Sequence, residues 1–180
     1  MLMGNVSAAS PWRTTWGESF NSVKAKYPEA TILDMSAESF CKGSSAEACQ
    51  MRQVILNRSV VGGLPARVIF GFSPEAKLKN IHVYLDEVEK YTPNRLGIAY
   101  TQLQLLLEKE YGKAVGAPAF SLRPDLRLSK GLSGKATSIW HTDDSIISLN
   151  ISVFGTDSED TPTKSSFFYI SYMPLELIGK

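Results

Sequence analysis

The sequence predicts an α+β protein, built as an antiparallel β-sheet with two helices packed on one face. Several short segments alternate apolar and polar residues, which is typical of strands with one packed and one open face. Two longer segments carry apolar residues at helical spacing. A hairpin pattern over residues 66–85 also runs directly into the longer helical segment. Together these patterns favour a sheet backed by helices.

Length and composition are those of a folded globular protein. The 180 residues suffice for one ordinary domain or two small fused ones, and they can bury a core without a metal. Hydrophobic residues make up 43% of the chain and charged residues 21%. The net charge of +1 provides no strong field for nucleic acid or an anionic membrane, so neither partner is expected. No apolar run approaches the roughly 18 residues of a membrane span.

A first helix is expected near residues 17–27. Its apolar face repeats at intervals of four, three and four residues and consists of Trp16, Phe20, Val23 and Tyr27. Two starts compete, because Thr15 with Glu18 fits a capping box while Ser19 fits the cap of a slightly later helix. Pro28 ends the helix, and a short strand is predicted over residues 31–35.

The next segments read as strands. Residues 51–57 form the first, and Gly62–Pro65 forms a turn. A hairpin over 66–72 and 78–85 follows. One face of this hairpin is expected to be inward and apolar, with Ala66, Val68, Phe70, Phe72, Ile81, Val83 and Leu85.

The longer helix is expected over residues 93–111. Thr92 is its cap, Pro93 occupies the first helical position, and Gly112 supplies a left-handed end. The predicted apolar stripe comprises Leu96, Ala99, Tyr100, Leu103, Leu106, Leu107 and Tyr111. Such a stripe requires a sheet face to pack against.

Residues 113–135 are rich in glycine, proline, serine and basic side chains, and their purpose is left open. Three strands are predicted after this loop, over about 137–142, 145–154 and 166–173. Asp143-Asp144 is the expected turn between the first two. In the middle strand Ile147, Leu149, Ile151 and Val153 alternate with residues of the open face.

The order of elements also suggests a duplication. After a flexible segment over residues 1–15, a single domain over 16–180 would consist of two halves, 16–91 and 92–180. Each half reads as a helix, a tyrosine with a breaker, and about three strands. The junctions are Lys26-Tyr27-Pro28-Glu29-Ala30 and Glu110-Tyr111-Gly112-Lys113-Ala114.

Several short motifs support a family resemblance: Trp16-Gly17, Lys26-Tyr27-Pro28, Phe70-Gly71-Phe72 with Leu78 and Ile81, Glu110-Tyr111-Gly112-Lys113, and Trp140 with the Ile147/Leu149 strand. From Trp16 to Met173 the layout resembles the tandem helix-plus-sheet fold of β-lactamase-inhibitor-like proteins and, more loosely, small outer-membrane assembly lipoproteins. The resemblance implies an exported, non-catalytic bacterial protein. No lipobox-type cysteine lies near the N-terminus, the basic loop at 113–135 has no counterpart, and no binding residue is carried over.

An open sheet face is the leading candidate for function. If the helices cover one face, the other face would carry Arg67, Asn80, His82, Tyr84 and, depending on strand register, Trp140, Phe167 and Tyr169. Aromatic side chains and arginine are enriched at binding hot spots. We therefore expect a non-catalytic binding or inhibitory protein that contacts a protein or a peptide. A second layer of the fold or a homodimer interface would use the same aromatic residues.

Two alternatives remain open. His141 and Asp143 would lie on one strand face beside Asp144, so an enzyme or a metal-dependent protein could be centred there. A complete metal-ligand set is missing, and no Gly-x-Ser-x-Gly elbow or glycine-rich phosphate loop follows a strand. No catalytic residue, metal or cofactor is therefore assigned. A structural component of the cell envelope is the other alternative.

The two cysteines bear on the compartment. Cys41 and Cys49 enclose a small, flexible loop that could close into a disulfide. Residues Met1–Ser10 have neither a basic start nor an apolar core, so they are not an intact signal peptide. With the close cysteine pair, we expect a periplasmic or secreted protein whose signal has been removed, with a cytoplasmic protein as the alternative.

The disulfide can be checked by counting free thiols. We expect none in denatured protein that was purified under oxidising conditions, because the Cys41–Cys49 bridge would consume both. The closed loop would add on the order of 2 kcal/mol of stability, which reduction should remove. Two reactive thiols per chain would contradict the prediction.

Overall fold

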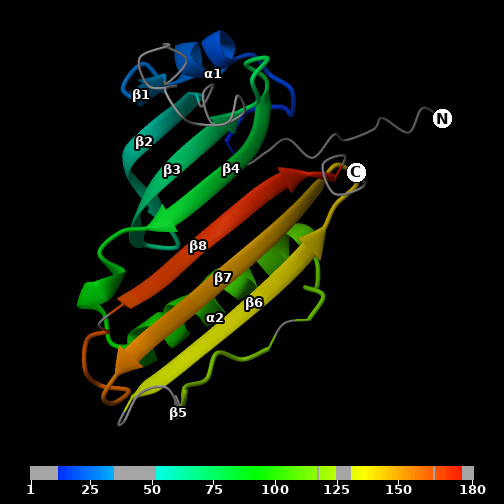
Figure 1. Ribbon diagram of the computed structural model, residues 1–180. Coiled ribbons are helices and arrows are strands. Elements are labelled where there is room, and N and C mark those ends of the chain that lie inside the picture. Colours follow the sequence, from blue (N-terminus) through cyan, green and yellow to red (C-terminus); the bar gives the residue numbers. More distant parts are fainter. Residues whose placement is uncertain (1–11, 35–51, 117, 125–130, 164, 176–180) are drawn as a thin grey trace, which may run out of the picture.

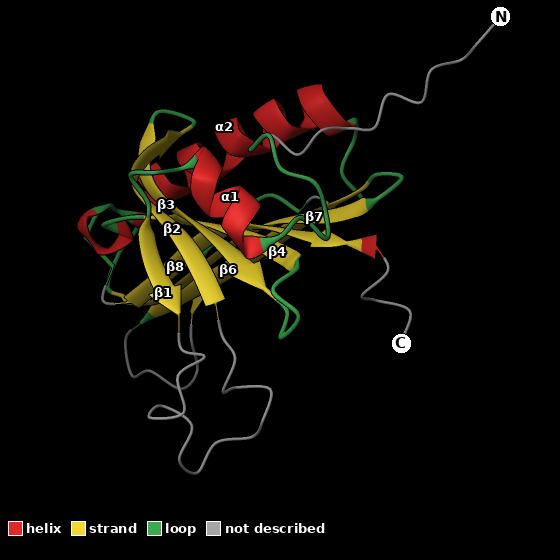
Figure 2. Ribbon diagram, turned by 90° about the horizontal axis from the view of Figure 1, so that it is seen from above, coloured by secondary structure: helices red, strands yellow, loops and turns green. Residues whose placement is uncertain are grey.

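One antiparallel sheet dominates the structure, a computed structural model that describes residues 12–34, 52–116, 118–124, 131–163 and 165–175. The sheet has eight strands in the order β1-β2-β3-β4-β8-β7-β6-β5. Two helices lie on one side of it (Figure 1 and Figure 2). The predicted α+β architecture, with an antiparallel sheet and two helices on one face, is confirmed.

The elements follow one another closely along the chain. They are α1 (Phe20–Lys26), β1 (Thr31–Asp34), β2 (Arg52–Val61), β3 (Leu64–Phe72), β4 (Leu78–Leu85), a 3₁₀ turn η3 (Val88–Lys90), α2 (Pro93–Tyr111), β5 (Arg123–Pro124), β6 (Leu132–His141), β7 (Ser145–Thr156) and β8 (Ser165–Pro174). Thr92 caps α2 as predicted, by accepting a hydrogen bond from the Arg95 amide. At the β2–β3 turn Gly62 and Gly63 both have positive φ angles of 59° and 78°, which explains the paired glycines.

The two halves of the chain meet in the middle of the sheet. Among the described residues, each half contains a helix followed by four strands, rather than about three. The last strands of the two halves, β4 and β8, pair with each other. The additional strand of the second half, β5, is only two residues long. The predicted repeat and its origin in a duplication stay predictions.

The core lies between the sheet and the helices. Phe20 of α1 meets Phe72 edge-on at 5.2 Å between ring centroids, and Tyr27 stacks on Phe70 at 5.2 Å. On α2 the fully buried Tyr100 ring packs beside Phe168, and its hydroxyl lies 2.7 Å from the Ser138 hydroxyl of β6. Both helices therefore pack on the same face, which we call the inner face (Figure 2).

The predicted stripe of α2 is wrong at Leu106, whose side chain is 52% exposed. The buried residues of the helix are Pro93, Leu96, Ala99, Tyr100, Leu103 and Leu107. Leu103 and Leu107 are one helical turn apart and both face the sheet. Leu106 lies to one side of this face and points towards the β2–β3 turn. A β-carbon on Gly62 would lie 3.7 Å from the Leu106 Cδ1 atom, so Leu106 borders the turn rather than the sheet.

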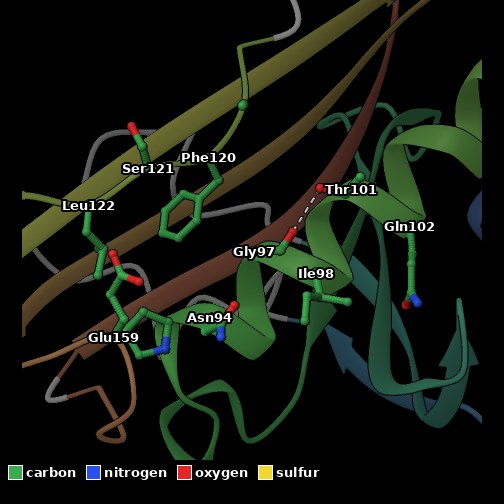
Figure 3. A pocket seen from close by; sticks show the side chains of 11 residues that line it. Asn94, Gly97, Ile98, Thr101, Gln102, Phe120, Ser121, Leu122 and Glu159 are labelled. Carbon is green, nitrogen blue, oxygen red and sulfur yellow. Dashed lines mark hydrogen bonds between the residues drawn. The ribbon is translucent and has the colours of Figure 1, made fainter.

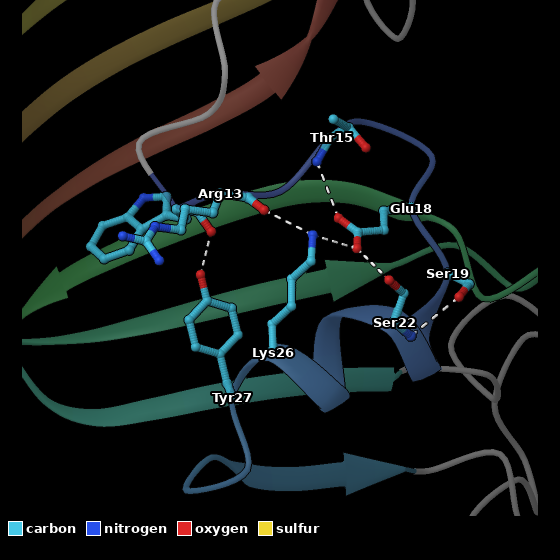
Figure 4. Close-up of polar contacts among 8 residues, drawn as sticks. Arg13, Thr15, Glu18, Ser19, Ser22, Lys26 and Tyr27 are labelled. Carbon is cyan, nitrogen blue, oxygen red and sulfur yellow. Dashed lines mark hydrogen bonds and ion pairs between the residues drawn. The ribbon is translucent and has the colours of Figure 1, made fainter.

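The segment before α1 is held to the helix by polar contacts (Figure 4). Ser19 is the cap, so the later of the two predicted starts is correct. Glu18 still reaches back to the Thr15 amide at 3.2 Å and pairs with Lys26 at 2.6 Å. Residues 12–15, expected to belong to a flexible segment, also bind α1, because Lys26 donates to the Arg13 carbonyl at 2.8 Å and Tyr27 donates to the Trp12 carbonyl.

The Tyr100–Ser138 hydrogen bond should contribute measurably to stability, because both hydroxyls are buried. Tyr100→Phe and Ser138→Ala each leave one hydroxyl without its partner, so each should lower the free energy of unfolding by about 1–2 kcal/mol. In the double variant the loss of unfolding free energy should be about 1 kcal/mol smaller than the sum of the two single losses, as urea unfolding would show. Strictly additive losses would mean that the two hydroxyls contribute independently.

Candidate functional site

The face of the sheet opposite the helices, the outer face, is open among the described residues (Figure 1). Two cross-strand rows of side chains run over its middle. The first row consists of Arg67, Tyr84, Tyr169, Asn150 and Thr137. The second consists of Ile69, His82, Ser171, Ser148 and Ile139. The outer face is thus continuous from β3 across the centre to β6.

Four rings gather where β4 meets β8, and we call them the aromatic patch: His82, Tyr84, Phe167 and Tyr169. The centroids of His82 and Tyr84 are 6.0 Å apart, and those of Tyr84 and Tyr169 are 5.7 Å apart. Phe167 lies two residues before Tyr169 on the same face and is 57% exposed. All four side chains project from two paired strands, so the sheet fixes the spacing of their backbone positions.

Polar groups border the aromatic patch on both sides. On β3 the Arg67 guanidinium bonds to the Asp86 carboxylate at 2.7 Å. On β6 and β7 the Thr137 hydroxyl donates to the side-chain Oδ1 of Asn150 at 3.0 Å, and the side-chain Nδ2 of Asn150 donates to the Ser148 hydroxyl at 2.9 Å. These bonds fix the direction of the amide and of the guanidinium, so their remaining donors and acceptors point in defined directions.

The structure brings five of the seven predicted binding residues together, namely Arg67, His82, Tyr84, Phe167 and Tyr169. Asn80 shares their face, but its side chain lies across the backbone of Gly71. A β-carbon on Gly71 would come within 2.1 Å of the side-chain Oδ1 of Asn80. The Asn80 side chain therefore covers the sheet at that point. Sequence reasoning did not single out Ser148, Asn150 and Thr137 as part of this site, although alternation with the apolar residues of β7 places the first two on this face.

The prediction is wrong for Trp140. This side chain lies on the inner face, is only 1% exposed, and donates its Nε1–H to the Gly112 carbonyl at 2.9 Å. Trp140 pairs with Ile147, whose side chain is also buried. Paired residues share a face, so Trp140 belongs to the core beneath the end of α2.

His82 lies in the aromatic patch in a neutral environment. Its Nδ1 atom is buried without a hydrogen-bond partner among the described residues. Burial lowers the pKa of His82 below its ordinary value, because the charged imidazolium would lose hydration. At neutral pH the ring is therefore uncharged and contributes aromatic surface.

The alternative centre at His141 coincides with the β6–β7 turn. His141 and Asp143 are exposed there. The neighbouring Asp144 carboxylate accepts hydrogen bonds from Thr142 at 3.0 Å and Ser145 at 2.7 Å, so it shapes the turn. Within the described ranges, no group of three or more His, Cys, Asp or Glu side chains is arranged to hold a metal. Cys41 and Cys49 lie outside the described residues.

Comparisons with protein-family models, with curated proteins and with solved structures find no match to this chain. The resemblance to β-lactamase-inhibitor-like proteins therefore stays a prediction. No described helix combines the length and the apolar character needed to cross a membrane.

Burial of His82 gives stability a pH dependence. The folded state resists protonation of His82, whereas the unfolded state binds a proton below about pH 6.5. The free energy of unfolding should therefore fall as the pH decreases from about 6.5 towards the lowered pKa of His82. Urea unfolding at about pH 7.5 and 5.5 should show a smaller fall for His82→Gln than for the unmodified protein.

The matched control is His141→Gln, which replaces the exposed histidine at the end of β6. This variant should keep the pH dependence of the unmodified protein. If the free energy of unfolding fell equally in His82→Gln and in the unmodified protein, His82 would not be the source of the pH dependence.

Proposed function

We propose that this is a non-catalytic, exported binding or inhibitory protein that uses the outer face to contact a protein or a peptide. The observation that carries the proposal is the aromatic patch at the junction of β4 and β8, with Phe167 57% exposed. Tyrosine rings provide a large contact area with little loss of side-chain entropy, and their hydroxyls can bond to a partner's backbone.

The arrangement around the patch supports a macromolecular partner. Binding hot spots usually consist of a few aromatic or arginine side chains within a polar rim. Tyr84 and Tyr169 lie at the centre of the outer face, and Arg67 and Asn150 lie beside them on the adjoining strands. The open, pleated surface spans several strands, which suits an extended partner surface better than a single small molecule.

The alternatives have weaker support. For an enzyme or a metal-dependent protein centred on His141 and Asp143, the described turn offers exposed side chains and an Asp144 carboxylate engaged in local hydrogen bonds. A second copy of this chain remains the main competitor as the partner, because a homodimer would cover the same rings.

The experiment is a pull-down from envelope extract with two matched double variants. Tyr84→Ser with Tyr169→Ser should lower the capture of specific partners by about tenfold or more, because two hot-spot rings are lost. Leu105→Ser with Leu106→Ser removes two exposed apolar side chains from the helix side and should leave capture unchanged. Circular dichroism and urea unfolding would establish that both variants fold.

Light scattering after size-exclusion chromatography separates a foreign partner from a second copy. A dimer that dissociates in the Tyr84/Tyr169 variant alone would identify this chain as the occupant of the outer face. Equal capture by the unmodified protein and both folded variants, with no change of oligomeric state, would remove the outer face as a binding site.

A further inference from the structure

A groove lies beside the first half of α2 on the helix side of the sheet, and none of the four patch residues lines it (Figure 3). Its volume is about 380 Å³, within the range of small-molecule sites. One wall is the first half of α2, and the other is the segment of residues 119–122 that runs beside it. Phe120 and Leu122 form the apolar part together with Ile98, which is 54% exposed.

One glycine allows the walls of this groove to approach each other, and a second allows the wall at residues 119–122 to lie close to β6. A β-carbon on Gly97 would come within 3.1 Å of the Phe120 ring, so the ring packs directly on the helix backbone. A β-carbon on Gly134 of β6 would come within 2.4 Å of the Ser121 carbonyl oxygen. Glycine inside a helix costs about 1 kcal/mol relative to alanine, and Gly97 is therefore explained by the contact with Phe120.

The charge of the groove is negative at one end. Glu159 is the only charged side chain among the described residues that line it. Glu159 is exposed, and no ion pair joins it to another described residue. In Figure 3 its carboxylate points towards Leu122, beside the apolar part of the groove.

The start of α2 does not offset this charge. Helix N-termini attract anions through free amide groups, but Pro93 has none. The Asn94 amide donates to the Glu159 carbonyl at 3.2 Å, and the Arg95 amide donates to the Thr92 hydroxyl at 3.3 Å. The backbone amides of Asn94 and Arg95 are thus occupied, and Glu159 is the one charged group among the described lining residues that an anion would meet.

We propose that this groove binds a small organic amine whose apolar body lies against Phe120 and Leu122 and whose ammonium group pairs with Glu159. An aromatic ring beside a carboxylate is well suited to such a cation, because the ring face and the carboxylate both attract positive charge. The Asn94 and Gln102 amides and the Thr101 and Ser121 hydroxyls supply polar contacts around the apolar body. This site does not depend on the function of the outer face.

The test uses three probes of one shape: 2-phenylethylamine, 2-phenylethanol and phenylacetate. Each is titrated into the full-length, ¹⁵N-labelled protein while the backbone amide signals are followed. The amine should shift the signals of Gly97, Ile98 and Phe120 along saturating curves, with a Kd on the order of 1 mM for so small a probe. Phenylethanol should bind more weakly, and phenylacetate should cause no saturating shift.

Two matched variants assign the charge. Glu159→Gln should weaken amine binding by about threefold, the size expected of an exposed ion pair, and should leave phenylethanol binding unchanged. Asp160→Asn removes the neighbouring exposed carboxylate, which does not line the groove, and should change neither. The proposal is overturned if amine shifts do not saturate, if they lie outside the groove, if phenylacetate binds equally well, or if both variants weaken amine binding alike.

Discussion

The pairing of β4 with β8 is the constraint on which the rest of the structure depends. It joins Ile81–Tyr84 to Tyr169–Tyr172, which are the last strands of the two halves of the chain. Its register turns Ile81, Val83, Ile170 and Tyr172 to the inner face, where all are buried, and places Tyr84 against Tyr169 on the outer face. Because side chains alternate along a strand, a slip of one residue would exchange these two sets. The continuous core and the aromatic patch therefore follow from the same register.

The two faces of this junction differ in how completely they are covered. On the inner face, α1 and α2 complete the packing through rings such as Phe20 and Tyr100. On the outer face the rings of Tyr84 and Tyr169 shield each other only in part, and Phe167 is left 57% exposed. Covering that surface would yield about 25 cal/mol for each Å² of apolar area removed from water. A partner on the outer face would gain this free energy, whereas the fold obtains little of it alone.

Local sequence patterns predicted the elements better than the way they fit together. Thr92, Pro93 and Gly112 delimit α2 by backbone chemistry within a few residues, and the hairpin of β3 and β4 follows from alternation. The expectation that Trp140 lies on the open face is wrong because its face depends on pairing across the β6–β7 turn. Counting outward from Asp143-Asp144 pairs Trp140 with Ile147 and would have placed it in the core. The strand β5 is too short, at two residues, to show a periodicity in the sequence. The groove depends on residues 97 and 120, which are brought together only by the fold.

The aromatic patch and the groove should also differ in their response to salt. Within the patch His82 is neutral at physiological pH, and Arg67 at its border is paired with Asp86. Attraction of a partner would therefore come from apolar area and hydrogen bonds. The groove relies on the exposed carboxylate of Glu159, whose attraction for a cation weakens as the Debye length falls from about 10 Å at 0.1 M salt to about 3 Å at 1 M. Apolar contacts are not screened in this way. Partner binding at the outer face should therefore change little with salt. Amine binding in the groove should weaken at high salt by up to the roughly threefold that the Glu159 ion pair contributes.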